Sequence, residues 1–434
     1  MKKNKQVFLL DTPNLFKVQI LHWINQFEVC TFLDSHTYTS PYTAVDCIAA
    51  VHPTSYISLE KVDPTSLDAY LEENKGAWIF AHLNYEYHNI TKSNSKVNLT
   101  GFPLAYFYTP AVTIELKGNR ATIESVHDNP QIIFNQIHTL DFSSGGQPLS
   151  STTTITPLVN KATYLDNIHK ILALIRRGDF YEINYCQAFE TILKNVHPVN
   201  LYEALTALSP TPFACFYKNN CDYLLCASPE RYLQKKGSHL ISQPIKGTIK
   251  RNTQNEIDDK IQLETLQNSS KDKSENVMVV DLVRNDLSRI CEQGSVEVSE
   301  LFGIYSYPQV HQMISTITGK INDNTSFSEI LEATFPMGSM TGAPKKSVME
   351  TIDLLEPTKR GLYSGTVGYI NPAGDFDFNV VIRSIFYNSQ SEKANYQVGG
   401  GITIYSDAEK EYEECLLKAS AIKKVLSTTD TTTD

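Results

Sequence analysis

The sequence predicts an α+β protein in which helices cover antiparallel β-sheets. Segments with the pattern of strands occur in runs and do not alternate strictly with helices, which argues against a Rossmann fold or a TIM barrel. No unit of about 20–50 residues recurs along the chain, which excludes solenoids and propellers. Hydrophobic residues make up 41% of the 434 positions, enough to build a sizeable core.

The acidic composition limits the partners of the chain. Its formal net charge is −10, so neither nucleic acid nor an anionic membrane surface is an expected partner. No run approaches the roughly 18 apolar residues of a membrane-spanning helix. The apolar run from Val7 to Leu10 is too short for a signal peptide, and the 8 cysteines include no CxxC pair. We therefore expect a cytoplasmic protein with reduced thiols.

Residues 1–150 form a first region of short strands and loops. Its strand candidates are Val7–Leu10, Trp78–His82 and Val112–Leu116, with turn residues between them. The segment from Asp141 to Thr156 is rich in Ser, Thr and Gly and is the best linker candidate. A larger region, residues 151–426, follows it, and the polar residues 427–434 form a tail that we expect to be disordered.

The larger region has firmer patterns. Residues 161–177 carry apolar side chains at helical spacing, and Gly178 ends that helix. Pro357 ends a shorter helix over residues 347–355. The other expected elements, in order, are strands over 180–190 and 222–227, a long helix over 270–290, an antiparallel meander of strands over 365–370, 376–387 and 396–405, and a terminal helix over 408–425.

Two predicted helices carry acidic pairs. Glu411, Glu414 and Lys418 share one face of the terminal helix, since they are spaced i, i+3, i+7. Asp272 and Glu275 have the same i, i+3 spacing on the long helix. Taken alone, each pair is typical of a solvated helix face. If both pairs face one cleft, their oxygen ligands would favour Mg²⁺ over zinc.

A lysine and a glutamate are candidates for acid–base chemistry. Lys246 directly follows a strand-like run and directly precedes Gly247, where a backbone can approach a ligand closely. A partly desolvated lysine can lose its proton and act as a nucleophile or a base. Glu230 could donate a proton if burial raises its pKa. A surface role is the commoner alternative for both residues.

Two glycine-rich segments could bind an anion. Residues 335–346 could hold one on free backbone amides, but their spacing differs from a Walker A loop. Residues 399–401 are either a hairpin or bulge, or a set of N–H groups that meet a carboxylate. Tyr363 and Arg383 lie on neighbouring predicted segments, and an arginine could clamp a carboxylate bidentately.

Eight segments, taken in order, resemble motifs of the chorismate-utilising enzymes. This family includes the first components of anthranilate synthase and aminodeoxychorismate synthase, together with isochorismate synthase and salicylate synthase. The resemblance runs from Thr156 to Val425. The segments are SPERY (228–232), PIKGT (244–248), KDKSENVMVVDLVRNDLSRI (271–290), FPMGSMTGAPK (335–345), RGLYSGTVGYI (360–370), VVIRS (380–384), VGGGI (398–402) and EYEECLLKA (411–419).

The resemblance implies a fold and a substrate. It implies two antiparallel sheets packed as an orthogonal sandwich, with helices outside and an N-terminal region like that of anthranilate synthase component I packed against it. The whole chain is then better described as one elaborated catalytic unit than as two independent domains. The implied substrate is chorismate, a dianion. Glu275 and Glu414 resemble the Mg²⁺ ligands of the family, with Asp272 and Glu411 in the outer shell.

The remaining site residues are also implied by the resemblance. Tyr363, Arg383 and the Gly399 amide resemble the site for the enolpyruvyl carboxylate, with Lys418 nearby. The backbone of Gly247 and Thr248 and the side chain of His311 are expected to line the ring.

The identity of residue 246 selects a branch of the family. A lysine at position 246 resembles the motif of the aminodeoxychorismate-forming branch, whereas the anthranilate-forming branch carries Ala at this position. In the former branch, the lysine attacks ring C2 and expels the C4 hydroxyl, which Glu230 would protonate. Ammonia from a glutaminase subunit then adds at C4. The product, 4-amino-4-deoxychorismate, leads to 4-aminobenzoate and folate.

Three alternatives remain open at this point. Anthranilate synthase component I is disfavoured by Lys246, and isochorismate synthase is disfavoured because its lysine base is replaced by Glu182. Amine-adding members usually carry Gln at that position, so Glu182 departs from both groups. A different class is a non-catalytic regulatory subunit that binds chorismate or tryptophan. The segment FLDS (32–35) loosely resembles the one that holds tryptophan in relatives.

Overall fold

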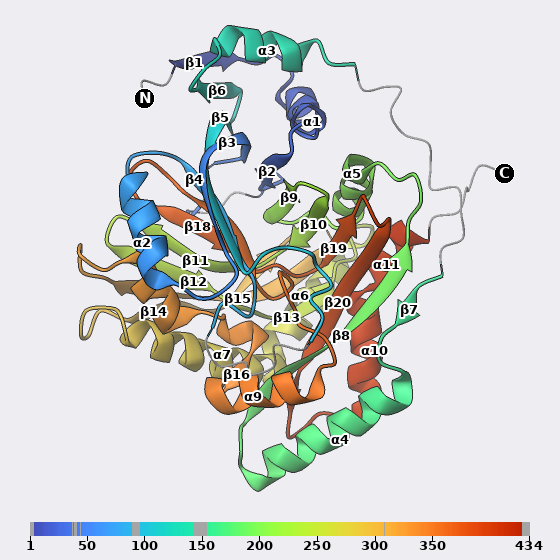
Figure 1. The fold of residues 1–434 in the computed structure, drawn as a ribbon. Helices are drawn as coiled ribbons and strands as arrows, with labels where there is room; N and C mark the ends of the chain where they lie inside the picture. Colours follow the sequence, from blue (N-terminus) through green and yellow to red (C-terminus); the bar gives the residue numbers. More distant parts are fainter. Residues whose placement is uncertain are drawn as a thin grey trace, which may run out of the picture.

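The structure of the 434-residue chain is a computed structural model that describes residues 4–36, 38, 41–43, 45–88, 96–141, 154–307 and 309–427. These residues form helices and antiparallel strands, which confirms the α+β class (Figure 1). No helix among them is both long and apolar enough to cross a membrane. Most of the predicted linker, residues 142–153, and the tail at 428–434 lie outside the described residues.

The N-terminal region is built from six strands and three helices in the described part of the chain. The predicted strands at Val7–Leu10, Trp78–His82 and Val112–Leu116 are confirmed, since each overlaps one of these strands, although Leu10 and Trp78 lie one residue outside theirs. The elements are β1 (Asn4–Leu9), α1 (Pro13–Ile24), β2 (Val29–Asp34), β3 (Cys47–Leu59), α2 (Pro64–Glu73), β4 (Ile79–Leu83), β5 (Ala105–Lys117), β6 (Arg120–Ser125) and α3 (Pro130–His138).

Two of these strands pair with strands of the larger region. β2 pairs with β9 (Phe213–Asn219), and β4 pairs with β17 (Thr366–Ile370), both antiparallel. The described strands therefore form one connected hydrogen-bonded network. That two sheets cross at right angles within this network stays a prediction.

The centre of the larger region is the long ladder between β8 (Glu182–Ile192) and β20 (Lys393–Thr403). Helix α4 (Lys161–Arg177) covers one face of it, with Ile168 and Ile171 buried in a cluster that includes Ile183 of β8 and Ile402 of β20. Each of these side chains contributes about 1.5–3 kcal/mol by its burial. Since side chains alternate along a strand, Glu182 and Asn184 point to the opposite face.

The caps of α4 explain why the helix has the predicted bounds. The side chain of Asn160 accepts a hydrogen bond from the Thr163 amide at the N-terminus. Gly178 ends the helix in the left-handed conformation, with φ +91°. The predicted helix over 161–177 is therefore confirmed.

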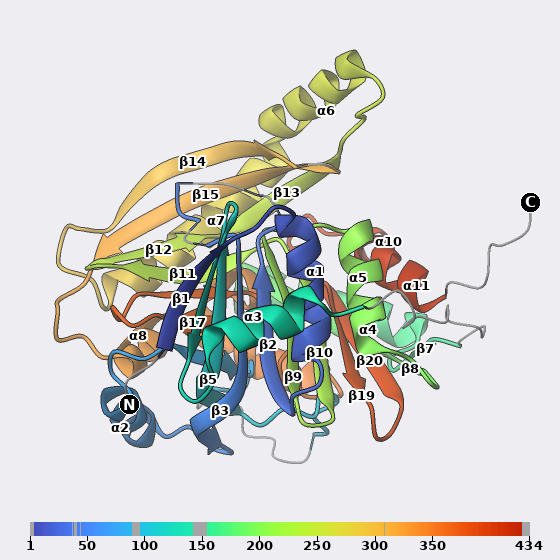
Figure 2. The ribbon, with the colours of Figure 1, turned by 90° about the horizontal axis from the view of Figure 1, so that it is seen from above.

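The rest of the region surrounds this ladder. Figure 2 shows α6 extending away from the body of the protein. The elements are β7 (Thr156–Pro157), α5 (Pro198–Leu208), β10 (Asp222–Ser228), β11 (Arg231–Lys236), β12 (His239–Gln243), β13 (Ile245–Lys250), α6 (Glu256–Asn268), α7 (Ser270–Ser288), β14 (Glu297–Ser306), β15 (Val310–Lys320), α8 (Phe327–Thr334), β16 (Gly342–Ala343), α9 (Lys345–Leu355), β18 (Phe376–Asn379), β19 (Ser384–Asn388), α10 (Ala408–Lys418) and α11 (Ser420–Leu426).

Two elements that were predicted to be continuous are each divided in two in the structure. The strand expected over 376–387 is two strands, β18 and β19, because the chain turns between them with Arg383 at a positive φ of 52°. β18 pairs with β11, whereas β19 pairs with β10 and β20, so the turn transfers the chain between neighbours. The terminal helix expected over 408–425 is also divided, into α10 and α11.

Candidate active site

A buried ion pair joins β8 and β13. Lys246 Nζ donates to Glu182 Oε1 at 2.7 Å, and the two side chains are only 12% and 6% exposed. A register shift between Ile245 and Thr248 brings Lys246 into this position, and Gly247 has a left-handed φ of 89° there. Burial disfavours the charge on Lys246, but Glu182, Glu275 and Glu230 outweigh burial and raise its pKa.

The glycines of β20 make room for this pair. A Cβ atom at Gly401 would lie 2.7 Å from Glu182 Oε1 and 3.0 Å from Lys246 Nζ. One at Gly400 would lie 3.5 Å from both Glu411 Oε2 and Lys418 Nζ. The hairpin or bulge considered for residues 399–401 is wrong, because the three glycines pair regularly with β8 inside one continuous strand. They bring α10 close to the Lys246–Glu182 pair.

The two acidic helices, α7 and α10, face a common region. Lys271 lies 3.8 Å from Glu275, and Lys418 lies 2.9 Å from Glu414. Burial disfavours the charge on Lys271, but the carboxylates of both helices raise its pKa: Glu275, Glu414, Glu411 and Asp272. Asp272 also meets the Lys246 segment, since a Cβ at Gly247 would lie 3.0 Å from Asp272 Cβ.

The carboxylates of α7 and α10 are the candidate ligands of a metal ion. As they stand, no three His, Cys, Asp or Glu side chains of the described residues converge closely enough to hold one. The available ligands are carboxylate oxygens only, which fits a hard cation such as Mg²⁺. Lys271 and Lys418 place positive charge beside Glu275 and Glu414.

Glu230 lies in the turn between β10 and β11 and is 5% exposed. Its burial raises the pKa to about 7, although Lys246 and Arg383 oppose the shift. A carboxyl with such a pKa can hold a proton at neutral pH and donate it. The predicted proton donor and the predicted nucleophile are thus electrostatically coupled.

Arg383, Tyr363 and Gly399, the residues expected to bind the enolpyruvyl carboxylate, differ in their contacts. The Arg383 guanidinium makes no hydrogen bond or ion pair with the described residues, and its burial lowers its pKa against the influence of Glu230. Tyr363 is 3% exposed, and its hydroxyl lies 3.6 Å from Cys186 Sγ. The carbonyl of Gly399 accepts a hydrogen bond from Lys418 at 3.2 Å. A half-buried guanidinium without such partners can recognise a carboxylate.

The ring of His311 contacts Ser306 and a residue of α6. Its Nδ1 lies 2.8 Å from Ser306 Oγ, and its Nε2 lies 3.1 Å from Asp259 Oδ1 on α6. The next residue, Gln312, pairs in register with Thr248. Gln312 is 1% exposed, and neither polar atom of its amide has a hydrogen-bond partner in the described structure. Sequence reasoning did not identify Gln312, and only the burial of its unpaired amide marks it.

Arg360 is a buried hub that sequence reasoning also missed. It is 1% exposed and donates to both carboxylate oxygens of Glu356, at 2.7 and 2.9 Å. It also donates to the carbonyls of Met340 at 2.7 Å and Asn184 at 2.8 Å. Its guanidinium stacks over Tyr85 at 4.5 Å. The hub therefore ties the glycine-rich loop at 335–346 to β8.

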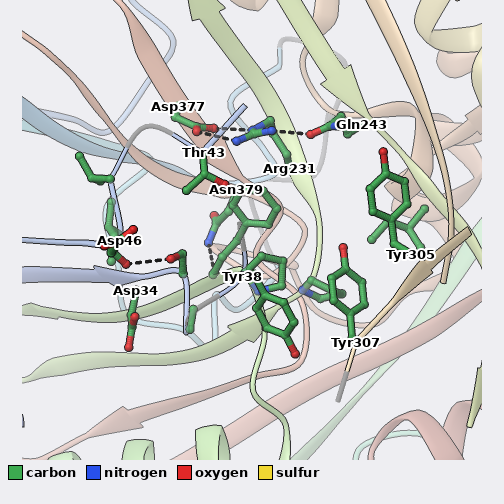
Figure 3. A pocket seen from close by; sticks show the side chains of 18 of the residues that line it. Asp34, Tyr38, Thr43, Asp46, Arg231, Gln243, Tyr305, Tyr307, Asp377 and Asn379 are labelled. Carbon is green, nitrogen blue, oxygen red and sulfur yellow. Dashed lines mark hydrogen bonds and ion pairs between the residues drawn. The ribbon is translucent and has the colours of Figure 1, made fainter. Parts of the chain in front are cut away.

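A cavity of about 340 Å³ lies beside the segments that carry Glu230 and Lys246 (Figure 3). The FLDS segment lines it through Leu33, Asp34 and Ser35. Arg231 borders it and donates to Asp377 at 2.8 and 2.9 Å. The residues that directly precede Glu230 and Lys246 line it too, as do the labelled side chains of Figure 3: Tyr38, Thr43, Asp46, Gln243, Tyr305, Tyr307 and Asn379.

Comparisons with known proteins agree with these features. A family model described as chorismate binding enzyme matches residues 28–424. An Arabidopsis thaliana protein named aminodeoxychorismate synthase, chloroplastic, is 40% identical over 274 residues, which cover 62% of this chain and 30% of that protein. The Salmonella typhimurium aminodeoxychorismate synthase component 1 is 36% identical over 264 residues, 61% of this chain and 57% of that protein. The chain thus matches less than two thirds of either relative.

A solved structure shares the fold. The crystal structure of anthranilate synthase component I from Streptococcus pneumoniae superposes with a TM-score of 0.75 at 22% identity. The superposition covers 90% of this chain and 95% of that one.

Proposed function

Because the chain belongs to the family of chorismate-binding enzymes, we propose that it aminates chorismate to 4-amino-4-deoxychorismate, on the route to 4-aminobenzoate and folate. The observation that carries the proposal is the buried Lys246, held at 2.7 Å by Glu182 and coupled to Glu230. Relatives named aminodeoxychorismate synthase support it.

The proposed reaction has two displacements. The neutral amine of Lys246 attacks ring C2, the ring double bonds shift, and the C4–O bond breaks. Glu230, whose burial raises its pKa to about 7, protonates the departing hydroxyl. Ammonia then attacks C4, the double bonds shift back, and the Lys246 amine leaves C2. Two allylic displacements replace one difficult substitution, which is the benefit of covalent catalysis.

The enolpyruvyl carboxylate would be recognised by a group of residues around the unpaired guanidinium of Arg383. Arg383 would bind the enolpyruvyl carboxylate, together with Tyr363, the Gly399 amide and Lys418. The backbone of Gly247 and Thr248 and the ring of His311 would line the substrate ring. These roles are supported by the unpaired guanidinium of Arg383 and by the position of Gly247 beside Lys246.

We propose Mg²⁺ as the cofactor. Glu275 and Glu414 would hold it, with Asp272 and Glu411 in the outer shell, because these carboxylates face a common region. The bound ion would neutralise the ring carboxylate of a dianionic substrate in an otherwise acidic site.

The ammonia donor is proposed to be a separate glutaminase subunit. The bacterial relative is named as component 1, which indicates that it works with another component. Free ammonium should replace this partner in vitro.

Product analysis of a Lys246→Ala variant tests the proposal. Chorismate, Mg²⁺ and ammonium are incubated with each enzyme, and products are identified by mass and retention. We expect 4-amino-4-deoxychorismate from the wild type and none from Lys246→Ala. Lys250→Ala, an exposed lysine on the same strand, should remain active. Full activity of Lys246→Ala would rule out the covalent mechanism, and anthranilate or isochorismate as wild-type product would assign the chain to another branch.

One observation favours a second candidate, a regulatory subunit that binds tryptophan. The FLDS segment lines the cavity of about 340 Å³ through Leu33, Asp34 and Ser35. Isothermal titration with tryptophan tests it. Binding of tryptophan without any turnover of chorismate would support this role over catalysis.

A further inference from the structure

We infer that Glu182 is the proton acceptor that converts Lys246 from an ammonium into the nucleophilic amine, and that it returns the proton when the amine leaves the substrate. The inference rests on the proposed covalent role of Lys246. It assigns a function to Glu182, whose role the resemblance leaves open.

The contact between the two groups is direct and shielded from water. Glu182 Oε1 accepts the hydrogen bond of Lys246 Nζ at 2.7 Å, a short charge-assisted bond. Both side chains are at most 12% exposed. The Lys246 ammonium makes no other hydrogen bond with the described residues. A proton that leaves Lys246 therefore has one bonded acceptor already in place.

The backbone of Glu182 is fixed on both sides. Glu182 pairs with Thr403 of β20 and with Ala343 of β16. A Cβ at Gly342 would lie 2.0 Å from the Glu182 carbonyl, and one at Gly401 would lie 2.7 Å from Glu182 Oε1. These close approaches hold the carboxylate in position before any substrate binds, which favours an acid–base role over a mobile surface charge.

The chemistry requires an acceptor. An ammonium has no lone pair, and the surrounding carboxylates favour the charged form: they overcome the effect of burial and raise the pKa of Lys246. Of these carboxylates, Glu275 is assigned to the metal and Glu230 must keep its own proton for the hydroxyl. Only Glu182 is left to accept one. The other charged groups that face this region are Arg383, Asp272, Lys271, Glu411, Glu414 and Lys418.

The protons balance over one cycle. Lys246 gives a proton to Glu182, attacks C2, and Glu230 gives its proton to the hydroxide that leaves as water. Ammonia attacks C4, and the Lys246 amine leaves. Glu182 then reprotonates Lys246, and Glu230 recovers a proton from the new C4 ammonium. Chorismate and ammonia have become aminodeoxychorismate and water, and the enzyme is restored.

A Glu182→Gln variant tests this role, because its amide can accept the lysine hydrogen bond but cannot take the proton. The rate of the Lys246 adduct is measured by intact mass after chorismate and Mg²⁺ are added without ammonia. We expect the rate to fall about a hundredfold, the low end for general base catalysis, with the chorismate KM changed by less than about threefold. Glu190→Gln, on the same strand, should match the wild type.

The pH profile separates proton transfer from a structural role. In Glu182→Gln the lysine must lose its proton to solvent, so the adduct rate should rise about tenfold per pH unit up to about pH 7 and level off above it, where Glu230 loses its own proton. The wild type should show no such rise, and Glu182→Asp should restore part of the rate. Equal rates and equal profiles in wild type and Glu182→Gln would overturn the inference. Absence of an adduct in the wild type would instead contradict the proposed function.

Discussion

Replacement of Arg360 by methionine should destabilise the protein severely. Methionine has a similar length but none of the donors with which Arg360 bonds Glu356 and the carbonyls of Met340 and Asn184. The Glu356 carboxylate is 5% exposed and would keep only the Cys186 amide, at 2.9 Å, among its hydrogen bonds to the described residues. Loss of one partner from a buried ion pair costs about 3–5 kcal/mol, because the other charge stays buried.

The loss should appear in equilibrium unfolding by urea, followed by circular dichroism. We expect the Arg360→Met variant to lose about 4 kcal/mol of the free energy of unfolding, a large part of the roughly 5–15 kcal/mol of a typical protein. A second change, Glu356→Gln, should recover part of that loss because it removes the unpaired charge.

An exposed pair is the matched control. Arg177 pairs with Asp179, and its side chain is 70% exposed. Arg177→Met should therefore change the free energy of unfolding by less than about 1 kcal/mol. If Arg360→Met also stays within about 1 kcal/mol of the wild type, the assignment of Arg360 as the hub is wrong.

Three further changes probe the site. Gly401→Ala should lower the rate of amination at least about tenfold, because its methyl group would displace the Lys246–Glu182 pair. The rate of Gly400→Ala should stay within about twofold of the wild type, and equal effects of the two changes would contradict this reasoning. Since burial raises the pKa of Glu230 to about 7, kcat/KM for chorismate should fall about tenfold per unit above pH 7, and Glu230→Gln should lose this dependence. Gln312→Met should raise the chorismate KM and leave the free energy of unfolding unchanged, because the Gln312 amide has no hydrogen-bond partner in the described structure to lose. A large loss of unfolding free energy would show that the amide hydrogen-bonds within the protein.

The sequence predicted elements well where local chemistry decides them. The bounds of α4 follow from its Asn160 cap and Gly178, and the long helix expected over 270–290 is confirmed as α7. Sequence reasoning missed α1 and α2 in a region expected to contain strands and loops. It also missed the break at Arg383, because the pairing of β18 and β19 with different neighbours is a tertiary effect.

The same limit applies to the site. Spacing placed the acidic residues of α7 and α10 on common helix faces, but it could not show that the two helices share one region. Glu182 was noticed as an unusual residue, yet its contact with Lys246 joins positions 64 residues apart on two strands, β8 and β13, that pair with other strands. Arg360 and Gln312 carry no periodic pattern. Only the structure marks them: the buried guanidinium of Arg360 has hydrogen-bond partners, whereas the buried amide of Gln312 has none in the described structure.

The pairing of β2 with β9 and of β4 with β17 has a consequence for how the chain unfolds. Separation of the N-terminal region from the rest would break two antiparallel ladders and leave strands with unpaired edges. Such edges expose rows of unsatisfied N–H and C=O groups that template aggregation. The two regions should therefore melt in one cooperative transition, and a truncated chain that starts at residue 154 should aggregate instead of folding alone.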